Sequence, residues 1–216
     1  MKYKVMIVED QTMPRELFEL RVQASEHFEV ALSVDNAALA DVYCLRFPVD
    51  LILMDVVTRG GESGLDAAER IKRAFPQTKI IIVTSMPECS YLSRAREIGV
   101  ESFWYKEEQR ESLLDVMERT MAGESVYPDA TPEMQLGLAS SYKFTDRELE
   151  VLREMTGGDT NQEIAERLHM SVATVKTHIL NMLEKTGFRN RIELAVRARE
   201  SGLVILNRKS ESHWKE

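Results

Sequence analysis

Five short runs of consecutive apolar residues divide the first half of the chain. The apolar positions within each run are contiguous and do not alternate with polar ones, as expected of strands whose two faces are both covered. We therefore expect buried strands at residues 4–8, 29–34, 50–54, 79–84 and 102–105.

The segments between these runs have the periodicity of amphipathic helices, with apolar residues spaced so that they share one face. Two such sets are Leu17, Leu20 and Ala24 in the first segment and Ala67, Ile71 and Ala74 in the third. Strands that alternate with helices predict a doubly wound α/β domain with a five-stranded parallel sheet. Five strand–helix units end near Ala122, so we expect this domain to span residues 1–122.

After residue 140 the apolar pattern becomes purely helical. Thr145 and Glu148 form a capping box for a first helix, and after a short second helix Ser171 is the expected N-cap of a third. With a fourth helix at about 191–201, the pattern predicts a small all-α four-helix domain over residues 141–209. The residues expected to face its interior are Leu149, Leu152, Met155, Ile164, Ala165, Leu168, Val175, Ile179, Met182 and Leu183.

The stretch between the two domains, residues 123–140, has the composition of a linker. Gly, Pro and Ser recur in it, and large apolar side chains are few after Tyr127. A short helix near Pro132–Leu138 is the element expected there. Residues 210–216 are expected to form a tail after the second domain.

The composition is that of an ordinary water-soluble protein, with 44% hydrophobic and 30% charged residues. No apolar run approaches the roughly 18 residues of a membrane span, and the amino terminus turns acidic too early for a signal peptide. Cys44 and Cys89 are isolated, which indicates two reduced thiols in a cytoplasmic protein. The net charge of −8 lies in the first 140 residues and the rest is nearly neutral, so we expect the two domains to have different partners.

Polar side chains follow four of the five expected strands at the point where each strand ends. Glu9 and Asp10 come after the first strand and Asp55 after the third. Thr84 closes the fourth and Lys106 the fifth. The carboxyl ends of parallel strands share one edge of an open α/β sheet, where ligands bind. We therefore expect these five residues to meet in one pocket.

The chemistry of this set predicts a phosphoryl-transfer site. Three carboxylates within a few Å of one another repel and raise each other's pKa, and a divalent cation removes that repulsion. Oxygen ligands without His or Cys favour Mg²⁺ over Zn²⁺. A carboxylate beside Mg²⁺, a hydroxyl and an ammonium can attack phosphorus while the cations neutralise the equatorial oxygens.

These residues and the strands before them resemble the receiver domain of bacterial two-component response regulators. The resemblance covers residues 1–122 and is carried by the acidic pair after "KVMIV" and by "LILMD", "IIIVTS" and "SFWYK". It implies that Asp55 is the phosphoacceptor. It also implies that Glu9 and Asp10 bind Mg²⁺ with it, together with the backbone carbonyl of Val57.

The same resemblance gives roles to three residues of the fourth and fifth strands. Lys106 is the ammonium that contacts the phosphoryl group, and Thr84 supplies the hydroxyl that moves toward it. Phe103, three residues before the Lys, stands at the position of the family's switch aromatic. A plain core aromatic is the alternative role for Phe103.

The chain departs from the receiver pattern at the loop after the third strand and after Lys106. Arg59 stands where the family usually has Pro, and the loop "TRGGESG" is one residue longer than usual before Gly64. Glu107 follows Lys106 in place of the common Pro, so a cis peptide bond is not assumed there. These departures concern that loop and leave the acidic set intact.

Two apolar residues flank the expected phosphoryl group. Val57 follows Asp55 by two positions, and Met86 follows Thr84 by two. Apolar side chains at these positions cannot orient an attacking water molecule. We therefore predict slow self-dephosphorylation and a long-lived active state.

The second domain fits a DNA-binding role. Two short helices joined by a tight turn, the second exposing Lys, Thr and Asn, fit helix-turn-helix recognition in a major groove, although other small helical bundles match this pattern too. Residues 144–195 resemble the LuxR-type four-helix DNA-binding domain through "T-x-R-E-x-E-V-L", "N-x-E-I-A-x-x-L", "S-x-x-T-V-K-x-H" and "K-x-G". The residues that this resemblance places against DNA are Thr174, Lys176, Thr177, Leu180, Asn181 and Arg191.

A receiver followed by this domain is similar to the NarL/FixJ class of response regulators. The resemblance implies a cytoplasmic transcriptional regulator, not an enzyme, whose Asp55 is phosphorylated with Mg²⁺ by a cognate sensor histidine kinase. Double-stranded promoter DNA, RNA polymerase and a second copy of the chain in an active homodimer are its implied partners, and no membrane is among them. Gln162 stands where the family often has Lys, so we expect one phosphate contact fewer.

The residues allow three other functions to be considered. A phosphohydrolase would use Asp55 as its nucleophile, but Val57 stands where a second acid or base is needed. A nucleotide-binding α/β protein would need a Gly-rich turn after the first strand, where the chain has "EDQTMP". A regulator of the same fold that works without phosphorylation is the remaining alternative.

Overall fold

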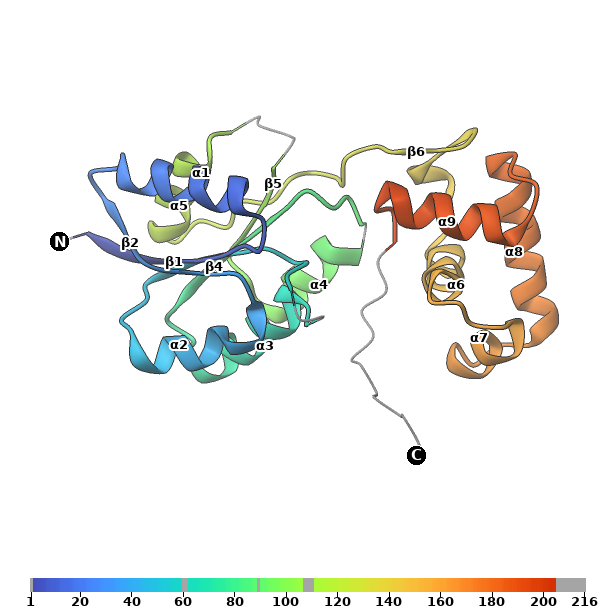
Figure 1. Ribbon diagram of the computed structural model, residues 1–216, viewed down its shortest axis with the longest axis horizontal. Helices are drawn as coiled ribbons and strands as arrows, with labels where there is room; N and C mark the ends of the chain where they lie inside the picture. Colours follow the sequence, from blue (N-terminus) through green and yellow to red (C-terminus); the bar gives the residue numbers. More distant parts are fainter. Residues whose placement is uncertain (1, 60–61, 89, 107–110, 205–216) are drawn as a thin grey trace. The chain divides into compact units, whose positions relative to one another are not determined.

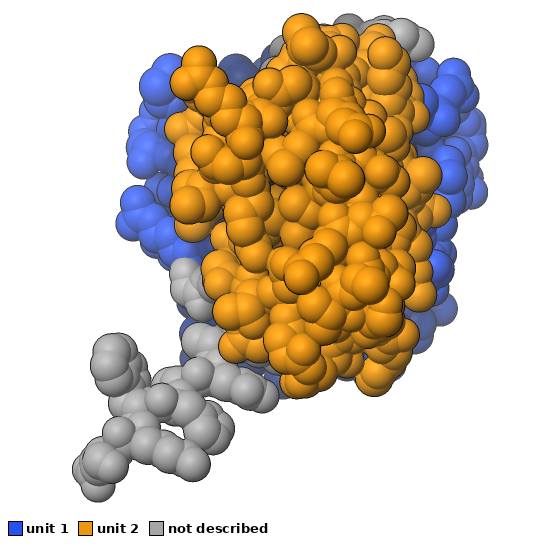
Figure 2. Space-filling model, turned by 90° about the vertical axis from the view of Figure 1, so that its right-hand side faces the viewer, with its two compact units in different colours: residues 1–85, 89–130, 207–216 blue, residues 86–88, 131–206 orange. Residues whose placement is uncertain are grey.

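The structure is a computed structural model that describes residues 2–59, 62–88, 90–106 and 111–204. These residues divide into two compact units, coloured separately in Figure 2: residues 2–85 with 90–130, and residues 131–204 with 86–88. The predicted boundaries at 122, 140 and 209 stay predictions. The expected tail, residues 210–216, lies outside the described residues.

The first unit contains a parallel five-stranded sheet in the order β2-β1-β3-β4-β5. Its strands are β1 (Tyr3–Val8), β2 (Phe28–Val34), β3 (Leu51–Met54), β4 (Lys79–Thr84) and β5 (Ser102–Tyr105). Its helices are α1 (Thr12–Gln23), the 3₁₀-helix η1 (Ala37–Leu39), α2 (Ala40–Arg46), α3 (Gly64–Ala74), α4 (Ser90–Ile98) and α5 (Leu113–Met121). The strand order reverses between β1 and β3, so the switch point at which ligands bind lies there.

Helices cover both faces of this sheet, with α1 and α5 on one face and α2, α3 and α4 on the other (Figure 1). The strand residues are buried because of this double cover: all four residues of β3 are inaccessible to solvent. The core under α1 and α5 includes Ile7, Leu53 and Trp104. The predicted doubly wound α/β domain is therefore confirmed.

The buried face of α1 differs from the predicted one. Leu17 and Leu20 are 45% and 64% exposed, and the residues that α1 buries are Phe18 and Val22. Phe18 meets Trp104 edge to face, with ring centroids 6.5 Å apart. Apolar residues occur on two faces of this helix, and the face with the aromatic side chain fills the space above the sheet. The prediction of a buried Leu17–Leu20–Ala24 face was wrong.

The chain continues along β5 after α5 ends. The carbonyl of Val126 accepts a hydrogen bond from the amide of Phe103 at 2.9 Å. The amide of Val126 donates to the Ser102 hydroxyl at 3.1 Å, and the Tyr127 hydroxyl donates to the carbonyl of Val100 at 2.7 Å. The first residues of the expected linker are therefore part of the first unit.

The second unit is helical, as predicted, with α6 (Asp146–Thr156), α7 (Asn161–Arg167), α8 (Val172–Thr186) and α9 (Arg191–Ser201), preceded by the 3₁₀-helix η2 (Ser141–Lys143). Thr145 and Glu148 form the expected capping box, and Thr160 and Glu163 form another at the start of α7. The Ser171 hydroxyl caps α8, which ends at Gly187 with a left-handed φ of 73°. The expected interior residues are buried or half-buried.

A two-stranded hairpin replaces the helix expected near Pro132–Leu138. Its strands are β6 (Gln135–Leu136) and β7 (Ala139–Ser140), which pair antiparallel. Gly137 turns the chain between them with a φ of 61°, in the region that favours glycine. A Cβ there would lie 2.2 Å from the carbonyl oxygen of Thr186, so the turn packs against the end of α8. The helix prediction was wrong because a two-residue turn needs this glycine conformation.

Candidate functional site

An acidic cluster lies at the carboxyl ends of β1 and β3, on either side of the switch point. Glu9, Asp10 and Asp55 each offer a carboxylate oxygen, and these oxygens lie within 4.8 Å of one another. Glu9 is inaccessible to solvent and Asp55 is 4% exposed. The Asp55 amide donates to the carbonyl of Val8 at 2.9 Å, so the pairing of the two strands fixes where the carboxylates meet.

Lys106 brings a positive charge into this cluster from the end of β5. Its Nζ lies 2.5 Å from Glu9 Oε2 and 2.8 Å from Asp55 Oδ2. The Lys106 amide donates to the carbonyl of Thr84 at 3.0 Å, which holds the end of β5 against the end of β4. Residues from the ends of β1, β3 and β5 therefore meet as the sequence predicted, and Thr84, which closes β4, is fully buried.

Burial and neighbouring charges shift the protonation of this cluster. Burial raises the pKa of Asp55 to about 6; Lys106 opposes this shift and Glu9 adds to it. Burial alone would lower the pKa of Lys106, but Asp55 and Glu9 together raise it above its ordinary value. The buried negative charge is thus only partly compensated by the chain's own ammonium, and the residues can hold a metal ion.

Sequence reasoning missed Arg15 as a contributor to this cluster. Its Nη1 donates to the carbonyl of Glu9 at 2.9 Å from the first turns of α1. The amide of Gln11 donates to Glu9 Oε1 at 3.1 Å, so the Glu9 backbone and side chain are both fixed. The only sequence signal was a basic residue six positions after an acidic one, which is too common to be informative.

Phe103 is buried in an aromatic group on β5. Its ring centroid lies 5.0 Å from that of Tyr105 and 6.3 Å from that of Tyr127. The guanidinium of Arg96 lies 4.7 Å from the centre of the Tyr127 ring, which connects α4 to this group. These contacts suit both a switch aromatic and a core aromatic, so the role of Phe103 stays a prediction.

The loop after β3 returns to the sheet through a short antiparallel bridge between Val57 and Ser63. Val57 is 37% exposed, and its amide lies 3.4 Å from Asp55 Oδ1. Arg59 is exposed. A Cβ at Gly64 would lie 1.9 Å from the carbonyl oxygen of Asp55, so only glycine fits where α3 begins. Glu107 and Cys89 lie outside the described residues, and Cys44 has a free thiol.

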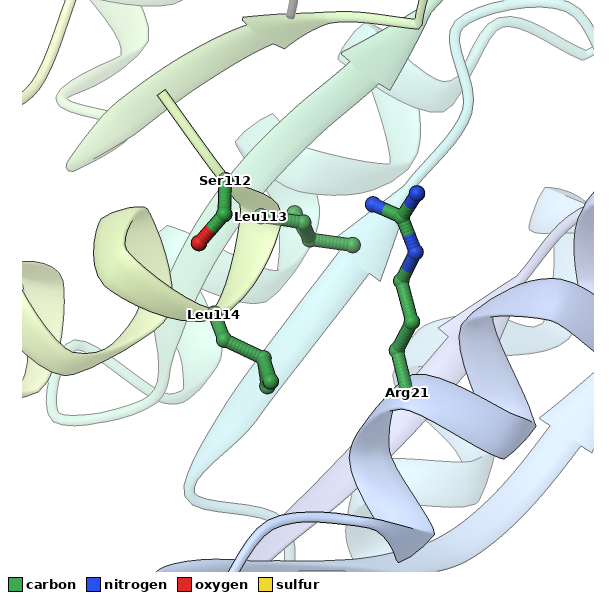
Figure 3. A pocket seen from close by; sticks show the side chains of 4 residues that line it. All are labelled: Arg21, Ser112, Leu113 and Leu114. Carbon is green, nitrogen blue, oxygen red and sulfur yellow. The ribbon is translucent and has the colours of Figure 1, made fainter.

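A separate hollow of about 260 Å³ lies between α1 and α5. Arg21, Ser112, Leu113 and Leu114 line it, and Figure 3 shows the Arg21 guanidinium across it from the two leucines. None of these four residues belongs to the acidic cluster. The hollow is therefore a different feature from the candidate phosphoryl-transfer site.

The face of α8 that the sequence assigned to DNA points to solvent. The exposed residues are Thr174, Lys176, Thr177, Leu180 and Asn181, and Leu180 is 56% exposed. Gln162 on α7 is also exposed.

Arg191 is placed differently from the other predicted DNA contacts. Its Nη1 donates to Asn161 Oδ1 at 2.8 Å and its Nη2 to the carbonyl of Asp159 at 2.7 Å. The half-buried guanidinium therefore fixes the start of α7 to the start of α9. A DNA phosphate contact from Arg191 stays a prediction.

Two models of protein families match the chain. The model described as "Response regulator receiver domain" matches residues 5–118, and the model described as "Bacterial regulatory proteins, luxR family" matches residues 142–198. Among the described residues, no helix is long and apolar enough to cross a membrane.

Relatives match over nearly the whole chain. Response regulator protein VraR of Staphylococcus aureus strain Mu3 is 31% identical over 209 residues, covering 94% of this chain and 100% of the relative. VraR of Staphylococcus epidermidis is 32% identical with the same coverage. Among solved structures, RcsB from Salmonella enterica serovar Typhimurium, bound to promoter P1flhDC with the phosphomimetic BeF3−, matches with a TM-score of 0.61. It is 21% identical and covers 94% of this chain and 100% of that one.

Proposed function

The chain belongs to the two-component response regulators that join a receiver domain to a LuxR-type DNA-binding domain, and from this premise we propose that Mg²⁺-dependent phosphorylation of Asp55 controls its binding to promoter DNA. The observation that carries the proposal is the buried Asp55 carboxylate within a cluster of two further acids and one ammonium. A buried carboxylate is costly unless it is paired, and titratable groups perturbed in this way cluster at functional sites.

The residues of the first unit have separate tasks in the transfer. One oxygen of Asp55 attacks the phosphorus of an acyl phosphate or phosphohistidine donor, and the bond from phosphorus to the donor breaks. Lys106, already 2.8 Å from Asp55 Oδ2, moves with the developing charge and neutralises a phosphoryl oxygen. The Thr84 hydroxyl donates to another of these oxygens. Arg15 and Gln11 keep Glu9 in position through the contacts described above.

The ligand set fits Mg²⁺. Glu9, Asp10, Asp55 and the carbonyl of Val57 would hold it, all through oxygen. The three carboxylates offer oxygens within 4.8 Å of one another, so one ion could contact all three. When bound, Mg²⁺ offsets the repulsion among the carboxylates and the charge of the incoming phosphoryl group.

The second unit supplies the output. Lys176 contacts a phosphate or a guanine edge, Thr177 and Leu180 contact thymine methyl groups, and Asn181 reads a base edge. Thr174 contacts the DNA backbone. RcsB, which shares this fold, has been solved bound to a promoter in the presence of a phosphomimetic, and this is consistent with the proposal.

The near neutrality of this unit limits what one copy can bind. Lys and Arg are balanced by Asp and Glu after residue 140, and phosphate contacts supply much of the affinity for DNA. We therefore propose a homodimer as the active form, with paired half-sites. A sensor histidine kinase in the same cytoplasm donates the phosphoryl group, and RNA polymerase receives the output.

Incubation of the full-length protein with Mg²⁺ and acetyl phosphate tests the proposal. We expect one phosphoryl group per chain, its loss in Asp55→Asn, and tighter binding to genomic promoter fragments after labelling. DNA binding without any labelling would instead support a regulator that works without phosphorylation. The logarithm of the DNA-binding constant should fall with the logarithm of the salt concentration, with a slope of about −0.9 for each phosphate that the protein neutralises. A binding constant that does not change with salt would contradict the DNA contacts.

A further inference from the structure

We propose that Arg70 is a positioning residue for the phosphoacceptor site, because it fixes the loop that presents the backbone of Val57 to the acidic cluster. The inference rests on the proposed function, since it concerns the same site. Arg70 lies on α3, outside the acidic cluster, and acts through Glu62.

The guanidinium of Arg70 joins four segments of the first unit. Its Nη1 donates to the Glu62 carboxylate in the loop after β3. Its Nε and Nη2 each lie 3.4 Å from an Asp41 carboxylate oxygen on α2, and Nη2 also donates to the carbonyl of Ala38 on η1 at 3.2 Å. A planar guanidinium with acceptors on three sides has a single orientation. Glu62 is therefore held relative to α2, α3 and η1 together.

Glu62 transmits this position to Val57 through the next residue. Ser63 forms the bridge to Val57, and its hydroxyl accepts the Leu65 amide at 3.2 Å as the N-cap of α3. The Gly64 amide donates to the carbonyl of Val56 at 2.8 Å. The arm that returns from the loop is thus hydrogen-bonded to the arm that leaves β3, and a shift of Glu62 would move the Val57 peptide.

The outgoing arm has a tether of its own at the same place. The buried Thr58 hydroxyl accepts the amide of Ala37 at 3.0 Å. Thr58 and Arg70 therefore attach the two arms of the loop to neighbouring residues of η1, Ala37 and Ala38. These two contacts explain how the loop can be one residue longer than usual. Each arm is hydrogen-bonded, directly or through Arg70, to η1, so the added residue does not change the position of Val57.

Because these side chains are partly exposed, the loss of Arg70 should affect the geometry at Val57 and the stability of the first unit to different degrees. Arg70 is 36% exposed, Asp41 30% and Glu62 26%. Ion pairs this exposed contribute little to the free energy of unfolding. The loss of Arg70 should therefore change the geometry at Val57 more than it changes the stability of the first unit.

Arg70→Met in the full-length protein tests the inference, with Arg73→Met as the matched control on the same helix. Within the described part of the chain Arg73 pairs with Glu69 one turn away, and it is 76% exposed. We expect Arg70→Met to weaken Mg²⁺ binding, measured by calorimetry, by about tenfold, the lower end of the range for residues that orient metal ligands. The Val57 amide resonance should shift as well, the control should match the wild type, and Arg70→Lys should recover part of the affinity.

Equal Mg²⁺ affinity in Arg70→Met and the wild type would overturn the inference, as would an equal loss in Arg73→Met. If Arg70→Met does not fold, Glu62→Gln replaces it, because that change weakens the same contact and leaves Arg70 with Asp41. Retained Mg²⁺ affinity in Glu62→Gln would then overturn the inference. A wild-type protein that binds no Mg²⁺ would instead contradict the proposed function, so the two failures are distinguishable.

Discussion

The ammonium of Lys106 lies 2.8 Å from Asp55 Oδ2, although the two residues are 51 positions apart. The same nitrogen lies 2.5 Å from Glu9 Oε2, so one cation is shared by two buried carboxylates. The side chain of Lys106 is 11% exposed, which keeps water from screening the pair. The charge of Lys106 is therefore already directed at the place where a phosphoryl group would arrive.

Lys106→Met should slow phosphorylation of Asp55 by acetyl phosphate by about 10²-fold, the lower range for loss of one preorganised donor. Mg²⁺ binding should become tighter, because the acidic cluster loses the cation that competes for it. Lys79→Met is the control, because Lys79 lies at the start of β4, at the opposite end of the sheet from the acidic cluster, and pairs with Glu101. A labelling rate within twofold of the wild type would contradict the role of Lys106.

Mg²⁺ affinity should depend on pH through Asp55, whose pKa is about 6. Below this value Asp55 binds a proton and loses its charge, and each pH unit lowers the ionised fraction by about tenfold. We expect Mg²⁺ binding about tenfold weaker at pH 5 than at pH 7.5. Burial raises the pKa of Asp55 in the folded protein from its ordinary value of 3.8 to about 6. The contribution of Asp55 to the free energy of unfolding is therefore present below pH 3.8 and is lost as pH rises through about 6. Asp55→Asn should remove the contribution of Asp55 to the pH dependence of Mg²⁺ affinity and to the pH dependence of stability.

Val57→Asn should shorten the lifetime of the phosphorylated protein. Val57 is 37% exposed at the position predicted to flank the acyl phosphate, and an apolar side chain there cannot orient water. An amide there would position the attacking water and speed hydrolysis by about tenfold, less than the about 10²-fold of a true acid or base. The decay of label after removal of the donor measures this. A wild-type protein that loses its phosphate within seconds would contradict the prediction.

Gly64→Ala should disturb the acidic cluster as well as the fold. The added Cβ would lie 1.9 Å from the carbonyl oxygen of Asp55 and 3.0 Å from the Met54 side chain. We expect a loss of about 1–3 kcal/mol in the free energy of unfolding, as for other overpacked sites, with weaker Mg²⁺ binding. Gly99→Ala is the control, because Gly99 has a φ of 82° but open space around it. It should cost stability without changing Mg²⁺ affinity.

Lys185→Met should destabilise the second unit. Lys185 Nζ lies 2.8 and 2.6 Å from the two oxygens of Glu148, which is 2% exposed. The loss should be about 2 kcal/mol, below the about 3–5 kcal/mol for a fully buried pair, because Lys185 is 31% exposed. Arg197→Met, which breaks an exposed pair with Glu200, should cost less than about 0.5 kcal/mol. Urea unfolding of the full-length variants measures both.

The effect of Lys185→Met should also depend on pH. Burial alone would raise the pKa of Glu148, but hydrogen bonds from Lys185 and Thr145 outweigh it and lower the pKa below 4.5. A lowered folded pKa gives stability that is present above the ordinary value and lost as pH falls below it. The difference between Lys185→Met and the wild type should therefore narrow as pH falls below 4.5. A constant difference would contradict the pairing.

The acidic cluster was predictable from the sequence because strand ends in a parallel sheet share an edge. Once the strands before Glu9, Asp55 and Lys106 were recognised, their meeting followed from topology alone. The capping box at Thr145 and the buried stripe of α8 were predictable for a similar reason, since both depend only on local spacing.

Other features depended on contacts that spacing does not encode. α1 offers two apolar faces, and only the space above Trp104 decides that Phe18 is the buried one. Arg191 looked like a surface cation, whereas Asn161 and the carbonyl of Asp159 hold it within the domain. The contacts of Arg70 with Glu62, Asp41 and Ala38 depend on the relative positions of α2, α3 and η1, which no periodicity predicts.

The hydrogen bond between Phe103 and Val126 has a consequence for how the receiver behaves as a fragment. β5 is an outer strand of the sheet, and open outer strands invite other chains to pair with them and aggregate. The chain covers this edge with its own residues after α5. A receiver cut after residue 122 would expose the edge and should self-associate, whereas one that extends to residue 130 keeps it protected.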